Sequence, residues 1–548
     1  MVLEIIRAEF GIVVKMLYIC SLEYFNCQNM KRTIICTLLA FVVMTVQAID
    51  EYQFHSGTAV LKGRILNKPA NEWEILTVYS YNLFTSGEQV HAIPVADDGS
   101  FEGVIPLAHS QSVRIDDIGD VFLAVGDTVE LTKDATQEYR EGVAFGGNSL
   151  SSTINQLWPA LQKHYFGDKP LSDGSLTEAE IPSWKLGMAK LMDTIIDEIK
   201  ADRLPLPKGT NSFVKEVLGA SLLGETFMAT LNVFRNNMTT LRRGAYYDFV
   251  VEREQWLLDN PAMMFAVSKP EFLINYAQFY MMTDIGYMDN SLRIGVHPRQ
   301  DNAEVAAYKS EFYLPRNYND ELHQRLLPLR ADTLMTIADY YRMASESIRK
   351  GYHLKKNDFL LQVTVCRDIF QEDHLDKSFA PDAMAAMFAA GIPIFEHPVV
   401  AYHAVEAYRQ YVISREGQSM TKASATPEAD AIFERIIAPY KGNALYIDFW
   451  GIGCGPCRVA MLEEREKVER MKDKPVRFLY ICDEKDSPRA LSEQWMQDNN
   501  IKGEHIYVTH EEWKQLSVKF QFSAIPFNLA LDKDGNSVER EYLDGLYR

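Results

Sequence analysis

The feature that most constrains the fold is an apolar run that leads directly into a Cys-x-x-Cys turn near the C-terminus. The segment reads Tyr446-Ile447-Asp448-Phe449-Trp450-Gly451-Ile452-Gly453-Cys454-Gly455-Pro456-Cys457-Arg458. A short apolar run bounded by glycines predicts a buried strand, and the residues after the second cysteine predict a helix. Two cysteines at this spacing are a dithiol that can form and break a disulfide. The sequence therefore predicts a strand, a turn and a helix with redox chemistry at the turn.

Strands and helices alternate throughout segment 427–548, which predicts an α/β domain. The expected helices are Pro427–Ile437, Cys454–Met471, Ser487–Asn499 and His510–Phe520, and the expected strands are Ala444–Trp450, Val476–Cys482, His505–Val508, Phe527–Leu531 and Ser537–Tyr542. Alternation of this kind indicates crossover connections around a central sheet. The turn residues Asp532–Asn536 predict that an antiparallel hairpin ends the sheet.

The rest of the chain predicts two further domains, because 548 residues suggest three or four domains at roughly 150 residues each. In 52–140, short β-rich runs separated by turn residues predict an antiparallel β-sandwich. The expected strands are Thr58–Leu66, Trp73–Tyr81, Phe101–Leu107 and Val121–Leu131. In 153–415 the apolar spacing is helical, with candidates at 184–199, 213–234 and 332–352, and predicts a mostly α middle domain.

The N-terminal residues predict export. Met30-Lys31-Arg32, the apolar run 33–46 and the small residues before a cleavage point after Ala48 form a secretory signal peptide, 30–48. The apolar run is shorter than the roughly 20 residues that a spanning helix needs, which favours cleavage over a membrane anchor. We expect translation to begin at Met30, so that 1–29 is an artefactual extension.

Composition excludes several classes of function. The formal net charge of −19, without a clustered basic face, argues against a nucleic-acid or anionic-membrane partner. Of seven cysteines, only Cys366, Cys454, Cys457 and Cys482 follow the signal peptide, too few for a disulfide scaffold. Cys366 and Cys482 lie in apolar runs and are expected to be packed thiols. No further pair with metal-ligand spacing accompanies the motif, and His374, His397 and His403 form no such set, so no metal and no cofactor is expected.

The C-terminal segment resembles the thioredoxin superfamily, and in particular the exported TlpA/ResA-type thiol:disulfide oxidoreductases. The resemblance spans about 120 residues and is carried by Asp448-Phe449-Trp450, Cys454-Gly455-Pro456-Cys457-Arg458 and Ile525-Pro526, in the order found in that family. The interval from Cys454 to Pro526, 526 − 454 = 72, leaves room for the family's insertion at 487–508. The presence of a β domain before it is similar to large envelope proteins of the Bacteroidetes type.

The roles of the motif residues follow partly from physics and partly from this resemblance. At a helix N-terminus Cys454 would be a stabilised thiolate and the attacking sulfur, and Cys457 would resolve the mixed disulfide and form the redox-active Cys454–Cys457 pair. The resemblance implies that Asp448 is a buried proton acceptor, with a satisfied structural carboxylate as the alternative. It also implies a substrate-facing surface, with these members: Trp450, Gly455, Pro456, Ile525 and the cis-proline Pro526.

The predicted function is therefore an exported, periplasmic or envelope, reductase of protein disulfides, supplied with electrons by another thiol protein such as a membrane thiol-transfer protein. The alternative is an envelope binding or scaffold protein in which the redox domain is accessory. A peroxiredoxin is excluded because position 451, three residues before Cys454, is glycine. Three features depart from the family: Gly453 replaces a tryptophan, segment 459–463 has no proline, and the last helix is expected to be missing.

Overall fold

The structure of the chain is a computed structural model that describes residues 53–85, 87–136, 149–167, 171, 176–177, 179–236, 261–267, 345, 359–370, 395–415, 426–538 and 540–546. The predicted extension 1–29, the predicted signal peptide 30–48 and His374 lie outside these ranges. So does the helix expected at 332–352, except for Ser345. Within the described ranges, the model has no helix with the length and apolar character needed to cross a membrane.

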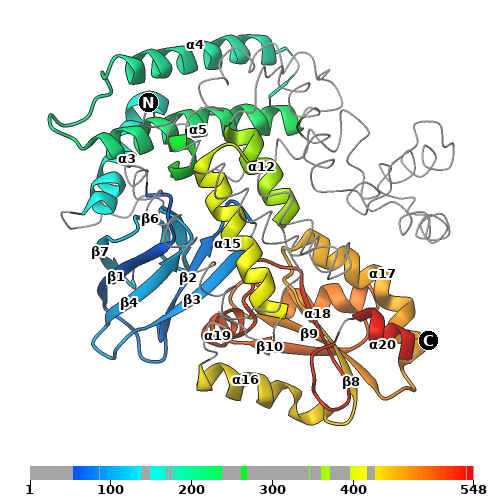
Figure 1. Cartoon of the computed structure of the whole chain (residues 1–548). Helices are drawn as coiled ribbons and strands as arrows, with labels where there is room; N and C mark the ends of the chain where they lie inside the picture. Colours follow the sequence, from blue (N-terminus) through cyan, green and yellow to red (C-terminus); the bar gives the residue numbers. More distant parts are fainter. Residues whose placement is uncertain are drawn as a thin grey trace, which may run out of the picture.

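The N-terminal part is a pair of β-sheets that enclose one apolar core (Figure 1). One sheet has the order β4-β1-β7 and the other β3-β2-β5-β6. The strands are β1 Gly57–Leu66, β2 Ile75–Tyr81, β3 Glu88–Pro94, β4 Ser100–Leu107, β5 Gln111–Ile115, β6 Gly119–Leu123 and β7 Thr128–Asp134. Alternate residues of both sheets, such as Leu61 and Val78, are fully buried between them.

Two details of the predicted sandwich were wrong. The run Val121–Leu131 is not one strand, because Gly126 adopts a positive φ of 83° and the chain turns there. It separates β6, in the second sheet, from β7, in the first. The chain passes from the second sheet to the first between β6 and β7, and β7 lies beside β1 in the same direction. This pair is therefore parallel, and the sheets are not purely antiparallel. The sequence analysis also missed β3 and β5.

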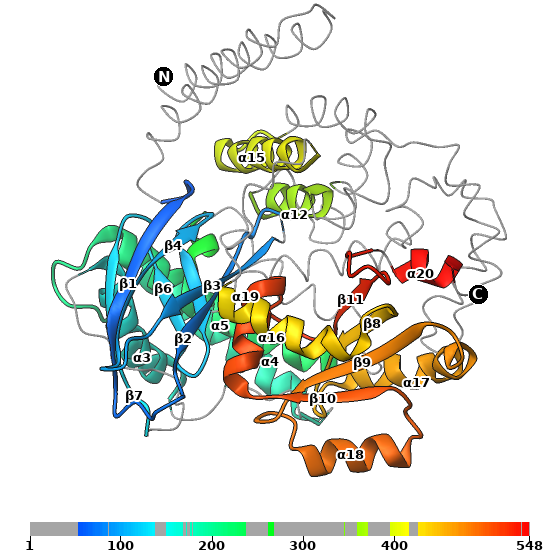
Figure 2. The ribbon, with the colours of Figure 1, turned by 90° about the horizontal axis from the view of Figure 1, so that it is seen from below.

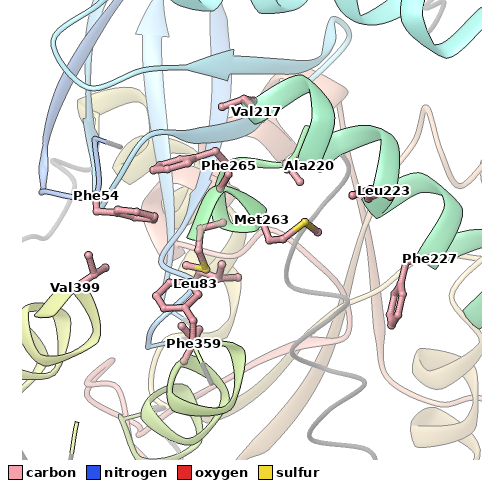
Figure 3. Packing of buried hydrophobic residues seen from close by; sticks show 14 of the residues in the cluster. Phe54, Leu83, Val217, Ala220, Leu223, Phe227, Met263, Phe265, Phe359 and Val399 are labelled. Atoms are coloured by element: carbon pink, nitrogen blue, oxygen red, sulfur yellow. The ribbon is translucent and has the colours of Figure 1, made fainter. Parts of the chain in front are cut away.

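The helices of the middle region pack on the second sheet through a core that they share with it. They are α3 Leu150–Phe166, α4 Ile181–Lys200, α5 Ser212–Asn236, η2 Pro261–Phe265, α12 Phe359–Phe370 and α15 Pro398–Arg415. Phe54 stacks on Phe265 of η2 with ring centroids 4.3 Å apart, and Leu83 faces the same cluster (Figure 3). Cys366 of α12 is fully buried there, as predicted. This core contains residues of both predicted domains, so it does not separate one from the other. The predicted bounds 52–140 and 153–415 therefore stay predictions.

The C-terminal part is a three-layer α/β/α unit around the sheet β10-β9-β8-β11, in which only β11 is antiparallel to its neighbour. Its strands are β8 Ala444–Phe449, β9 Val476–Asp483, β10 Glu504–Val508 and β11 Phe527–Leu531. Its helices are α16 Pro427–Ile437, α17 Gly455–Met471, α18 Arg489–Asp498, α19 His510–Phe520 and α20 Arg540–Leu546, and a short η4 spans Ala438–Tyr440. Residues of α17, α18 and α20 pack on one face of the sheet, and those of α16 and α19 on the other.

The end of this unit differs from the prediction. Instead of a strand over Ser537–Tyr542, Ser537 makes a single bridge to Leu531, and α20 follows. Leu543 of α20 is fully buried in the core beneath α17. The expectation of a missing last helix was therefore wrong, because burial of Leu543 outweighs the weak strand pattern of this short segment.

Helix α19 joins the C-terminal unit to the sandwich and lies between β8–β10 and the strands β2 and β3 (Figure 2). Val518 packs against Ile75 and Val90 of the sandwich. Gln521, just after the helix, accepts a hydrogen bond from the Val90 N–H (3.0 Å) and donates one to the Val90 carbonyl (2.9 Å), so both backbone groups of Val90 in β3 are paired with this side chain. Glu511 accepts from the backbone N–H of Trp73 at 2.9 Å.

A charged cluster completes this contact. His510 bridges Asp483, 2.6 Å from its Nδ1, and Asp117 of the sandwich, 3.2 Å from its Nε2, and Lys485 binds the same Asp117 at 2.6 Å. Burial lowers the pKa of His510, but the hydrogen bonds and charges of the two carboxylates outweigh it and raise the pKa to about 9. His510 is therefore a cation near neutral pH and stabilises the contact between the two units.

We expect His510→Gln to lower the free energy of unfolding at pH 6 by about 2 kcal/mol. Because the pKa of His510 is raised from 6.5 in the folded protein, its contribution is complete below pH 6.5 and is lost as the pH rises through about 9. Urea unfolding at pH 6 and pH 10 measures this. His164→Gln, in the last turn of α3, is the control. An equal deficit for His510→Gln at both pH values would contradict the assignment.

Candidate active site

The dithiol lies where β8 gives way to α17. Cys454 is the N-cap of α17, and its Sγ accepts a hydrogen bond from the backbone N–H of Cys457 at 3.1 Å. Gly455 and Pro456 occupy the first turn, where a proline needs no hydrogen-bond donor. The two cysteines form a disulfide in the structure. Because the N-terminus of a helix favours negative charge, the sulfur of Cys454 is placed where a thiolate is stabilised.

The two cysteines differ in exposure. Cys457 is 2% exposed and belongs to the same buried apolar cluster as Trp450, Tyr446 and Met461, whereas Cys454 is partly exposed at the edge of that cluster. A substrate disulfide can therefore reach Cys454 but not Cys457. The geometry supports attack by Cys454 and resolution by Cys457.

Asp448 lies on the face of β8 that α17 covers, since residues 446, 448 and 450 of the strand alternate to that side. It is 8% exposed, and burial raises its pKa to about 6. The guanidinium of Arg540 in α20 lies 3.1 Å from the carboxylate and lowers the pKa of Asp448. Glu464 of α17, which contacts Arg540 at 3.2 Å, raises the pKa of Asp448 further. In the structure the charged partner of the Asp448 carboxylate is therefore Arg540.

We expect Arg540→Gln to raise the pKa of Asp448 above about 6, because the substitution removes the cation that favours the carboxylate. The pH at which Asp448 loses its proton, followed by NMR of a labelled side-chain carboxyl, measures the change. Lys472→Gln, at the far end of α17, is the matched control and should leave that pH unchanged. A downward shift in the Arg540 variant would contradict the ion pair.

The residues expected to face substrate differ in how close they lie to the surface beside the dithiol. The Ile525–Pro526 peptide bond is cis, and Ile525 packs at the edge of the cluster that contains Cys454. A Cβ at Gly451 would lie 3.2 Å from Ile525 Cδ1, so glycine there allows the two segments to approach. Trp450 is 1% exposed and packs beside Trp495 with ring centroids 5.8 Å apart. This burial favours a packing role for Trp450 over contact with substrate.

The surface next to Cys454 is open. A Cβ at Gly453 would meet no atom within 4 Å, so the space beside this residue is unfilled. Ser487 closes the other side of the turn, where its hydroxyl accepts from the N–H of Ile452 at 3.0 Å. The sequence analysis missed Ser487, Arg540 and Glu464, and none of them has a motif signal, because only the folded chain brings them to the turn.

The remaining thiols and histidines give no second reactive centre among the described residues. Cys482 is buried at the end of β9, and burial raises its pKa to about 12, so it is a packed thiol as predicted. His403 is fully buried, with Nε2 3.0 Å from the Phe54 carbonyl oxygen. The described part of the chain contains no group of three or more His, Cys, Asp or Glu side chains that could hold a metal ion.

No family model matches the chain, and no curated protein matches it. Among solved structures, the thioredoxin domain of a thiol-disulfide oxidoreductase from Bacteroides vulgatus is similar at 15% identity with a TM-score of 0.19, over 20% of this chain and 84% of that one. A thioredoxin-family thiol:disulfide interchange protein from Chlorobium tepidum TLS is similar at 19% identity and a TM-score of 0.18, over 19% of this chain and 71% of the other. StoA from Bacillus subtilis is similar at 16% identity and a TM-score of 0.17, over 19% of this chain and 75% of the other. The interpretation of the site therefore rests on its own geometry.

Proposed function

We propose that this protein is a thiol:disulfide oxidoreductase that reduces protein disulfides with its Cys454–Cys457 dithiol. The observation that carries the proposal is the placement of Cys454, a partly exposed residue that caps α17 while its disulfide partner Cys457 is buried. A nucleophile at an electropositive helix end with a shielded resolving thiol is what disulfide exchange requires.

The proposed reaction has two exchange steps. The thiolate of Cys454 attacks one sulfur of the substrate disulfide, the substrate S–S bond breaks, and one substrate thiol leaves with a proton from solvent. Cys457 then transfers its proton to Asp448 and attacks Cys454 Sγ, which breaks the mixed disulfide, and the second substrate sulfur leaves as a thiol with a proton from solvent. Two electrons pass from protein to substrate, and another dithiol protein must resupply them.

The proposed direction is reduction. Asp448, buried on the side of the sheet that carries Cys457, disfavours a second negative charge on the reduced pair and so favours the disulfide form of this protein. A protein whose own disulfide is favoured is a reductant, as is thioredoxin at about −270 mV, in contrast to DsbA at about −120 mV. Equilibration with glutathione redox buffers tests this, and a potential near the DsbA value would contradict it.

The exported, TlpA/ResA-like character of the protein is part of the proposal and is supported by its N-terminal sequence and by the order of Asp448, the Cys454–Cys457 motif and Ile525-Pro526. An oxidising compartment supplies the protein disulfides that such an enzyme would reduce. Fractionation of cells that express the full chain, followed by N-terminal sequencing, tests it. Recovery in the cytoplasm with residues 30–48 still attached would contradict export.

The test of activity is turnover of a peptide disulfide with a chemical dithiol as donor. We expect Cys454→Ser to abolish turnover and Cys482→Ala, which removes a buried thiol of the same unit, to retain it. Equal turnover in the wild type and in Cys454→Ser would contradict the proposed function.

A further inference from the structure

A cavity of about 360 Å³ lies beside the loop that carries Ile525-Pro526. Its walls come from three parts of the chain: the sandwich, with strands β2 and β5 and single residues of β3 and β6, Met264 and Arg367 of the helical region, and Ser523 and Ala524 of the C-terminal unit. Ala524 is bonded directly to Ile525, which packs in the cluster of Cys454. Ala524, which lines the cavity, is therefore the direct neighbour of a residue that packs beside the dithiol.

The wall on the redox side is held in place by the sandwich. The hydroxyl of Ser523 donates to the carboxylate of Glu88 in β3, and Arg114 Nη2 of β5 donates to the Ser523 carbonyl oxygen at 3.4 Å. Gln521, two residues earlier, is fixed to Val90 by two hydrogen bonds. The loop before Ile525 thus has partners outside its own domain, and the sandwich forms part of the surroundings of the dithiol.

The floor of the cavity is the outer face of the second sheet. Ser112 and Arg114 alternate with Val113, which is buried in the sandwich core, so both project to the opposite side of β5. Tyr79 and Tyr81 of β2 also line the cavity. An outer sheet face would ordinarily meet solvent, and here the helical region and the loop 523–524 enclose it.

The chemistry of the lining is polar and balanced in charge. Two arginines, Arg114 and Arg367, are matched by two carboxylates, Glu88 and Asp120. The other polar members are hydroxyl, amide, imidazole and phenol groups, from Tyr79, Ser80, Tyr81, His109, Gln111, Ser112 and Ser523. A surface with donors, acceptors and aromatic rings but no excess of either charge suits neutral polar groups such as peptide units.

Two of these groups lack a hydrogen-bond partner in the part of the chain that the structure describes. The Ser112 hydroxyl and the Nε2 of His109 are buried and have no hydrogen-bond partner among the described residues. His109 is 2% exposed, and its other ring nitrogen is already bonded to the Ser110 carbonyl oxygen at 2.8 Å. Buried polar groups without partners are costly, so the residues that line the cavity carry hydrogen-bonding capacity that the described part of the chain leaves unused.

We propose that this cavity receives the polypeptide segment adjacent to the substrate cysteine, so that extended polypeptides bind more tightly than small-molecule disulfides, which are too short to occupy it. The inference rests on the proposed function and adds the sandwich and α12 to the substrate site. A peptide extends by about 3.3–3.6 Å per residue, so a cysteine held at Cys454 can place residues a few positions away in the cavity.

The test fills the cavity without touching the dithiol. We expect Ser112→Trp to raise KM for a peptide disulfide at least about tenfold, a change of about 1.4 kcal/mol, and to leave the rate with glutathione disulfide unchanged. Val104→Trp, at an exposed position of β4 in the other sheet, is the matched control and should change neither rate. Unchanged kinetics with both substrates, or an equal loss with both, would overturn the inference.

A second measurement does not depend on how well the tryptophan variant folds. A photo-reactive benzoyl-phenylalanine at position 112 should crosslink to a peptide held as a mixed disulfide on Cys454 in a Cys457→Ser background, whereas the same residue at position 104 should not. Absence of a crosslink at 112 while the mixed disulfide is present would overturn the inference. If wild-type protein reduced neither peptide nor glutathione disulfide, the proposed function itself would fail.

Discussion

The Cys457→Ser protein is expected to accumulate a covalent complex in which Cys454 is joined to its substrate by a disulfide. Only Cys454 is exposed enough to attack, and without the buried thiol of Cys457 the second exchange step has no nucleophile. Steady-state turnover should fall by roughly a thousandfold or more, because the intermediate can be released only by external thiols. Non-reducing electrophoresis with mass spectrometry of the adduct measures both its amount and its attachment site.

The controls for this experiment separate the enzyme from a binding protein. A Cys454→Ser/Cys457→Ser double variant should capture nothing covalently, and Cys366→Ala, which removes a thiol in the helical core, should behave as wild type. If the double variant still captured the same partner without a covalent bond and Cys457→Ser formed no adduct, the scaffold alternative would be favoured.

The Asp448→Asn protein is expected to exchange disulfides more slowly and yet to be more stable. The carboxylate can accept the proton of Cys457 only above its pKa of about 6, so wild-type turnover should rise with pH through that value. The variant lacks the acceptor, so the rate of the resolving step should fall by roughly 100-fold or more and should not rise with pH in this range. Single-turnover release of the second substrate thiol, measured from pH 5 to pH 8, tests this.

The stability half of the prediction follows from the same pKa. Because the pKa of Asp448 is raised from 3.8 in the folded protein, the protonated carboxyl stabilises the fold at low pH, and that stability is lost as the pH rises through about 6. At pH 7 the charged side chain therefore costs about 2–3 kcal/mol, which asparagine avoids. Arg540 keeps Glu464 as a partner in the variant. A variant less stable than wild type at pH 7 in urea unfolding would contradict this account.

The strand, turn and helix at the dithiol could be predicted because their signals are local. The predicted bounds of α16, α19 and β11 match the structure, since Thr426 and Thr509 supply N-caps and the apolar spacing is regular. Local signals did not reveal α20, whose buried Leu543 depends on contacts made across the domain. They also gave no sign that Gly126 would send β7 to the far sheet and make it parallel to β1.

In the candidate site, too, the residues with local sequence signals could be predicted and the residues brought in by long-range packing could not. Cys454, Cys457 and Asp448 belong to one continuous segment, so their spacing could be interpreted directly. Arg540 reaches Asp448 from almost a hundred positions away, and Glu88 reaches Ser523 from the other end of the chain. Such contacts depend on how the sandwich, α19 and α20 are packed, and neither periodicity nor motif spacing encodes that packing.

The most direct test of the central claim is the stoichiometry of a single turnover. Fully reduced protein is mixed with an equimolar peptide disulfide, and the peptide thiols and the state of Cys454 and Cys457 are measured together by mass spectrometry. The account predicts that each peptide disulfide reduced yields one Cys454–Cys457 disulfide, with Cys366 and Cys482 still reduced. Peptide reduction with Cys454 and Cys457 left as thiols, or no reduction by the fully reduced protein, would contradict it.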